Sequence, residues 1–120
     1  MATHEPAMGV RRRDGAAIID LTGDINSRAE HALEAAWTEA ADPPGTVVLN
    51  FEGAHYINST GIALIVGLLA RARAGGIPIR ACGLSDHYRE IFEITRLADF
   101  MPIATDEDSA VEGAERTDHA

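Results

Sequence analysis

The chain has 120 residues, 46% of them hydrophobic, and a formal net charge of −9 at pH 7. This length suits one domain with a single core, and the hydrophobic fraction argues against a wholly disordered chain. The negative charge argues against direct binding to nucleic acid, which needs a basic surface that displaces counterions.

Two strands joined by a turn are the first predicted elements. Residues Met8 to Arg13 and Ala16 to Leu21 flank Asp14-Gly15, a dipeptide typical of tight hairpins. Thr22-Gly23-Asp24 is expected to end the second strand. The arginines at positions 11–13 favour a solvated, charged strand at the edge of a sheet over a phosphate-binding site.

A helix and a buried strand are predicted next. Ser27 and Glu30 have the spacing of a capping box, in which each side chain satisfies an unpaired backbone N–H group. Asp42-Pro43-Pro44-Gly45 ends this helix, because proline cannot continue it. Residues Thr46 to Phe51 are apolar or β-branched without alternation, which indicates a strand covered on both faces of a mostly parallel sheet.

The second helix is expected to start near Ser59 and to end at Gly75-Gly76. It has almost no polar face before Arg71, whereas a helix packed only on a sheet normally exposes one. Either a third helix covers the extra apolar surface, or part of that surface is a docking patch beside Ser59.

The remaining elements are shorter. Ile77 to Ala81 predicts a strand, which Pro78 places near an edge. Ser85 is expected to cap a third helix, Met101 to Ala104 to form a last strand, and Asp106 to Ala114 to add a weak helix. This alternation indicates an α/β fold with right-handed crossovers: a mixed, mostly parallel sheet of four to five strands with about four helices.

The turn before the second helix carries the residues of chemical interest. Asn58, Ser59 and Thr60 are all residue types that cap helices. A helix start also has unpaired N–H groups and a partial positive charge, which would stabilise a phosphoryl group on Ser59. That group would add about −1.5 to −2 charges, enough to disrupt an interface at this turn. The residues alone leave both roles open, and one serine can have both.

Other motifs of chemical function do not occur. Ile57 stands where a nucleophile elbow has glycine two positions before its serine, and no glycine-rich phosphate-binding loop is found. Cys82 is the single cysteine, which excludes a disulfide within the chain, and the histidines and acids lack metal-ligand spacing. We therefore expect no enzyme activity, no cofactor and no bound metal.

The expected location is the cytoplasm. The longest apolar run, Ile62 to Ala70, is too short to cross a bilayer. The N-terminus has no basic region followed by an apolar stretch, so no export signal is visible.

Three sequence elements in order resemble the STAS domain of bacterial anti-sigma factor antagonists, over about Met8 to Val111. The resemblance is carried by Leu21-Thr22-Gly23-Asp24-Ile25-Asn26, by Val47 to Phe51 with Ile57-Asn58-Ser59-Thr60-Gly61, and by Ile79 to Leu84 with Ile91 to Leu97. It implies a STAS-like fold over residues 8–114, a lead-in at 1–7 and a flexible tail at 115–120.

The resemblance implies partner switching controlled by phosphorylation. An unphosphorylated antagonist of this type binds an anti-sigma factor, often a serine kinase, and frees a sigma factor; a PPM-type phosphatase reverses the phosphorylation that ends the complex. By the match, Ser59 is the phosphate acceptor. We further expect Ser59 to be the only significant acceptor, with Thr60 a structural cap. The partner-binding residues would be Gly23, Asp24, Asn26, Asn58, Thr60, Gly61 and Ile62.

Two positions differ from the family pattern. Asn58 and Asn26 stand where acidic residues are frequent, although Asp24 retains an acid nearby. The alternative is a non-switching STAS interaction module in a transporter, lipid-transport or stress-sensing complex. The oligomeric state is left open, a weak homodimer included.

Overall fold

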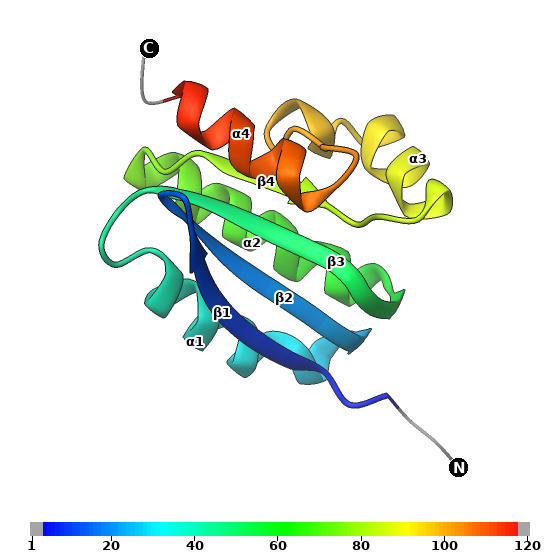
Figure 1. Ribbon diagram of the computed structural model, residues 1–120. Helices are drawn as coiled ribbons and strands as arrows, with labels where there is room; N and C mark the ends of the chain where they lie inside the picture. Colours follow the sequence, from blue (N-terminus) through cyan, green and yellow to red (C-terminus); the bar gives the residue numbers. More distant parts are fainter. Residues whose placement is uncertain (1–3, 118–120) are drawn as a thin grey trace.

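The strands form where aliphatic and β-branched residues run without helical spacing. The computed structural model describes residues 4–117 and contains one sheet (Figure 1). Its strands are β1 (Ala7–Arg13), β2 (Ala16–Ile25), β3 (Thr46–Ile57) and β4 (Ile79–Cys82), in the order β1-β2-β3-β4. The β1–β2 pair is antiparallel and the other two pairs are parallel, so the predicted mixed, mostly parallel sheet is confirmed.

Helices cover both faces of this sheet. They are α1 (Glu30–Ala40), α2 (Ser59–Gly75), α3 (Asp86–Ile94) and α4 (Glu107–Thr117), with short 3₁₀ turns η1 (Ser27–Ala29) and η2 (Leu97–Asp99). In Figure 1, α1 and α2 lie behind the sheet and α4 lies on the opposite side, next to β4. The predicted α/β architecture with four helices is confirmed.

The alternation of side chains along each strand divides the core in two. The larger part lies between the sheet and α1 and α2, where Ile19 and Leu49 meet Trp37 and Ile65. The smaller part lies under α4. It consists of Ala16, Ile18, Val48, Cys82, Ala110 and Val111, all buried.

The two central strands are longer than predicted. We expected β2 to end at Leu21 and β3 at Phe51, but the paired region continues to Ile25 and Ile57. The register of the β2–β3 pair shifts between Asp20 and Thr22 and again after Gly23, and the pairing resumes after each shift. The extension carries both strands to the start of α2.

Two local predictions are wrong. The capping box of Ser27 and Glu30 does not form, because the Asn26 side chain accepts the hydrogen bond from the Arg28 N–H group and begins η1 instead. The predicted strand at residues 101–104 is reduced to a single bridge between Ala81 and Ile103. Its neighbour Pro102 lacks an N–H group and cannot extend the ladder.

The predicted domain limits stay a prediction. β1 begins at Ala7, within the expected lead-in, and residues 1–3 lie outside the described part. Residues 115–117 of the expected tail belong to α4, and residues 118–120 are likewise not described.

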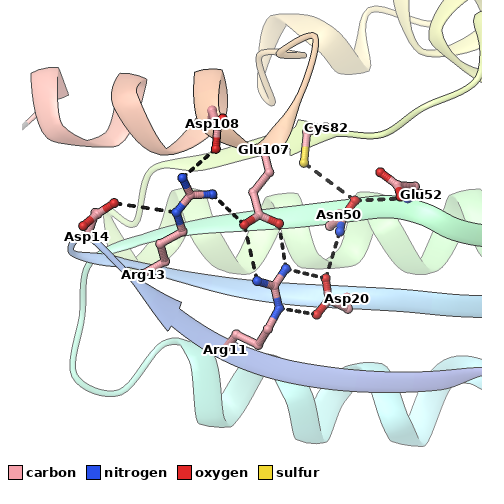
Figure 2. A network of polar contacts seen from close by, with 9 residues as sticks. All are labelled: Arg11, Arg13, Asp14, Asp20, Asn50, Glu52, Cys82, Glu107 and Asp108. Atoms are coloured by element: carbon pink, nitrogen blue, oxygen red, sulfur yellow. Dashed lines mark hydrogen bonds and ion pairs between the residues drawn. The ribbon is translucent and has the colours of Figure 1, made fainter.

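The arginines of β1 tie the two helical layers to the sheet edge. Arg11 and Arg13 point toward α4, where each contacts Glu107, at 2.7 and 2.8 Å (Figure 2). Arg12 points the other way and donates to the carbonyls of Glu39 and Asp42, at 2.8 and 2.7 Å, at the C-terminal end of α1. The predicted edge position is confirmed, and the three arginines of this edge strand bind groups of the same chain.

A chain of polar contacts continues from β1 across the sheet. Arg11 also holds Asp20 through two hydrogen bonds of 2.6 and 2.8 Å, and Asn50 donates to Asp20 at 2.9 Å. The hydrogen bonds from Arg11 lower the pKa of both Asp20 and Glu107 below the ordinary carboxyl value. Burial raises the pKa of the neighbouring Cys82 thiol to about 11. At neutral pH the carboxyl groups of Asp20 and Glu107 are therefore ionised and the Cys82 thiol is protonated.

Lowering the pH should weaken this network, and the pH dependence of stability tests this. Because the pKa values of Asp20 and Glu107 are lowered in the folded chain, their contribution is complete above the ordinary carboxyl pKa. It is lost as the pH falls from there through the folded values. The Asp20→Asn, Glu107→Gln double variant should be less stable at pH 7 by about 1 kcal/mol, since the pairs are partly exposed.

The same double variant should lose less stability than the unaltered chain between pH 7 and roughly pH 3. Urea unfolding at the two pH values measures both quantities. Glu90→Gln, at an exposed position of α3, is the control that should leave the pH dependence unchanged. Equal acid sensitivity of the double variant and the unaltered chain would contradict the assignment.

Candidate functional site

The first turn of α2 presents Ser59 to solvent. Ser59 is the first residue of the helix, and both it and Thr60 are exposed. Asn58, just before the helix, has extended backbone angles, and its side chain accepts a hydrogen bond of 2.8 Å from the Gly61 N–H group. Asn58 is therefore the cap, and the prediction that Thr60 caps this helix is wrong.

The start of α2 rests directly on the end of β2. The Asn58 N–H group donates to the Ile25 carbonyl at 3.2 Å. Gly61 faces the same carbonyl so closely that a Cβ atom there would lie 2.0 Å from its oxygen. Only glycine allows this approach. The contact fixes Ser59 beside the segment that follows β2.

The segment at the end of β2 is held from its other side by the N-terminus. Gly23 has a φ angle of +82°, and a Cβ there would lie 2.2 Å from the Glu5 carbonyl oxygen. The Asp24 N–H group donates to the His4 carbonyl at 2.7 Å. The rings of His4 and His55 stack with centroids 3.7 Å apart. This side of the site is therefore built from three separate stretches of chain.

The predicted site residues lie at one edge of the sheet, at the carboxyl ends of β2 and β3. Ser59 and Thr60 are exposed there, and Asp24, Asn26, Asn58 and Ile62 are half-buried. Gly23 and Gly61 are buried and have packing roles. The structure thus brings the predicted residues together. Their role in binding or modification stays a prediction.

A phosphate on Ser59 would meet a neutral turn. The first turn of α2 contains no acidic residue. In the described part of the chain, no acceptor is recorded for the N–H groups of Ser59 and Thr60, whereas that of Gly61 is bound to Asn58. Two free N–H groups and the helix dipole suit an anion at this position.

Some contacts around the site had no signal in the sequence. The Tyr88 hydroxyl of α3 accepts a 2.9 Å hydrogen bond from the Ile57 N–H group, which steadies the last residue of β3. Tyr56, one residue earlier, is 58% exposed next to this turn. The stacking of His4 on His55 was equally unforeseen, since the two residues are distant in sequence.

The outer surface of α2 is only partly covered. Ile62 and Leu64 are half-buried against the core, but Ala63, Val66 and Ala70 remain exposed. The third helix therefore does not cover all of the extra apolar surface.

Within residues 4–117, no helix is long and apolar enough to cross a membrane. The same residues contain no group of three or more His, Cys, Asp or Glu side chains placed to hold a metal ion.

Comparisons with known proteins were made for the sequence and for the fold. The family model described as the STAS domain matches residues 7–110. BtrV of Bordetella bronchiseptica, named as a candidate anti-sigma factor antagonist, is 31% identical over 98 residues, which cover 81% of this chain and 84% of BtrV.

Solved structures share the fold. The anti-sigma factor antagonist SpoIIAA in its unphosphorylated form superposes with a TM-score of 0.69 at 18% identity, covering 95% of this chain and all of that one. A sulfate transporter family protein from Wolinella succinogenes superposes with a TM-score of 0.76 at 14% identity, over 93% of each chain. At these identities the superpositions establish the fold alone.

The contact between Gly61 and Ile25 can be tested by adding one methyl group. Gly61→Ala should lower the free energy of unfolding by about 3 kcal/mol, because the new Cβ collides with a backbone oxygen that cannot turn away. Gly67→Ala on the same helix has nothing within 4 Å of its Cβ. That change should raise stability by about 0.5–1 kcal/mol.

Urea unfolding of the two single variants measures the difference. Losses of similar size for Gly61→Ala and Gly67→Ala would show that the effect belongs to the helix and not to the contact.

Proposed function

The chain belongs to the STAS domain family, and from that premise we propose that it is an anti-sigma factor antagonist controlled by phosphorylation of Ser59. In the unphosphorylated state it binds an anti-sigma factor of the serine-kinase type and thereby releases a sigma factor. The sequence relative BtrV supports this assignment.

The observation that carries the proposal is the position of Ser59. Its hydroxyl is exposed at the first residue of α2, and the end of β2 lies beside it through the contacts of Asn58 and Gly61 with Ile25. A partner that covers this edge would contact both segments at once. A modification of Ser59 would then stand inside the interface.

Phosphorylation changes the charge of this turn and little else. The Ser59 Oγ atom bonds to the γ-phosphorus of ATP, the bond between that phosphorus and the β–γ bridging oxygen breaks, and ADP and the hydroxyl proton leave. The product adds about −1.5 to −2 charges, which the N–H groups at the helix start stabilise within this chain. The same charge opposes a partner surface fitted to a neutral turn.

Asn58 gives this chain a neutral cap where acidic residues are frequent in the family. The amide oxygen binds the Gly61 N–H group at 2.8 Å without adding a charge beside Ser59. The phosphoserine is therefore less repelled by its own neighbours. The kinase, in turn, recognises a turn without that acid.

The remaining parts of the proposal follow from the switch. A PPM-type phosphatase hydrolyses the phosphoserine, releases inorganic phosphate and restores the binding form. The chain acts in the cytoplasm as a binding protein without enzyme activity, and it does not contact nucleic acid directly.

The second candidate is an interaction module without a switch, in a transporter, lipid-transport or stress-sensing complex. A sulfate transporter family protein shares the fold, and the neutral Asn58 favours this candidate. Gene neighbourhood separates the two: a kinase-like anti-sigma factor or a phosphatase gene supports the switch, and transporter genes support the module.

Binding to the kinase-type anti-sigma factor tests the proposal. Ser59→Ala should keep the affinity of the unaltered chain, and Ser59→Asp should weaken it on the order of tenfold or more, because a charge is buried in the interface. Titration calorimetry measures both dissociation constants. Equal affinities of the two variants would rule out the switch.

A phosphotransfer assay identifies the acceptor. After incubation with the kinase and ATP, peptide mass spectrometry should place the phosphate on Ser59. The Thr60→Ala variant should be phosphorylated to the same extent as the unaltered chain. Asn58→Asp is the matched variant that restores the acid of the family, and its rate measures what the kinase gains from that charge. Phosphate on Thr60, or on no residue, would contradict the proposal.

A further inference from the structure

A shallow groove runs along the C-terminal half of α2, beyond the Ser59 turn. It has a volume of about 310 Å³ and is lined by Val66, Leu69, Ala70, Arg73, Leu97 and Phe100. A second hollow of about 270 Å³ adjoins it and shares Leu69, Arg73 and Phe100. Together they form the α2–η2 groove, whose lining is apolar apart from Arg73 and, at the far end, Asp99.

The α2–η2 groove exposes large apolar side chains. Phe100 is 55% exposed and Val66 is 43% exposed, whereas Leu69 and Leu97 form a buried floor beneath them. Exposed aromatic and aliphatic groups gathered over a hollow mark binding surfaces more often than scattered ones do. Phe100 does not belong to the buried core, whereas its neighbour Met101 is fully buried there.

Arg73 supplies a positive charge at the rim. Its guanidinium lies over the Phe100 ring, 5.4 Å from the ring centroid. Among the described residues, no carboxylate is recorded as its ion-pair partner, whereas Arg11, Arg13, Arg28 and Arg96 all have one. The Arg73 guanidinium is therefore available to pair with an anionic group from outside.

We propose that the α2–η2 groove docks an acidic amphipathic helix of a partner protein. An aliphatic side chain of that helix would fill the hollow between Val66 and Phe100, and a carboxylate about one turn away would pair with Arg73. This binding mode, a helix in an apolar groove, uses side chains on one helical face as anchors.

Shape favours this occupant over a fatty acid. A fatty acid offers the same carboxylate and apolar tail, but the groove is an open surface channel and would leave most of the tail in water. A helix needs to bury only single side chains in each hollow.

The docking would be separate from the switch at Ser59. Val66 lies seven residues after Ser59, or about 10 Å along the helix axis. A segment bound over Phe100 and Arg73 therefore leaves the first turn of α2 free. The proposal does not rest on the phosphorylation of Ser59.

Two synthetic peptides test the proposal with the full chain. One is a stapled amphipathic helix of about three turns with two leucines one turn apart and a glutamate at the next turn; its twin has lysine in place of the glutamate. Titrated into the ¹⁵N-labelled chain, the glutamate peptide should shift the amide signals of Val66, Ala70 and Phe100. The lysine twin should bind on the order of tenfold more weakly, because it faces Arg73.

Substitutions of the exposed groove residues sharpen the result. Arg73→Glu should reverse the preference between the two peptides, and Phe100→Ala should weaken both. Arg71→Glu is the matched control on α2, since Arg71 lines the hollow toward α1, and it should leave the preference unchanged. Ser59→Asp should also leave it unchanged, which keeps this test distinct from that of the switch. Thermal melts followed by circular dichroism verify that each variant is folded.

Three results would overturn the proposal. The first is equal binding of the two peptides, or none, by the folded chain. The second is signal shifts that map to another surface. The third is occupation by laurate or by a second copy, detected by signal shifts with laurate alone or by sedimentation velocity, and abolished by Phe100→Ala while the peptides fail to bind.

Discussion

The site depends on one backbone contact, the seating of the first turn of α2 on the carbonyl of Ile25. The oxygen accepts from Asn58 and leaves no room for a side chain at Gly61. The contact holds the first turn of α2, on which Ser59 is exposed, beside the segment after β2. A helix start that floated on a flexible loop could present a serine, but not a serine in a fixed relation to a second segment.

A polar network in the middle of the strands supports this edge. The polar network of Arg11, Asp20 and Asn50 joins three strands just before the register irregularities in β2 and β3. Beyond those irregularities the two strands run on to Ile25 and Ile57, where the site begins. The network thus fixes the register at the last regular pair, Asp20 with Asn50, and the extension that follows inherits that register. A fixed register in the middle of the strands therefore helps to position their carboxyl ends.

The sequence predicted the parts of this fold that rest on local patterns. Turn and cap residues predicted three of these parts, and the structure confirms them: the hairpin at Asp14-Gly15, the cap at Ser85 and the end of α2 at Gly75-Gly76. The strand ends were not, because β2 and β3 continue only by pairing with each other, a non-local interaction that no window of sequence contains. The capping residues were assigned wrongly because several residues near each helix start can cap. In the structure Asn58 and Asn26 make the capping hydrogen bonds. Stacking of His4 on His55 depends wholly on the fold.

The contacts of Arg11 and Arg13 with Glu107 also have a consequence for how the chain is made. These residues are separated by more than 90 positions, so β1 is synthesised well before the α4 helix that it contacts. Until α4 emerges, Ile18 and Val48 have no cover on that face of the sheet. Long-range contacts of this kind form late and leave apolar surface open in the meantime. Synthesis of this protein therefore includes an interval in which the four-stranded sheet carries one bare apolar face, and the synthesis of α4 ends that interval.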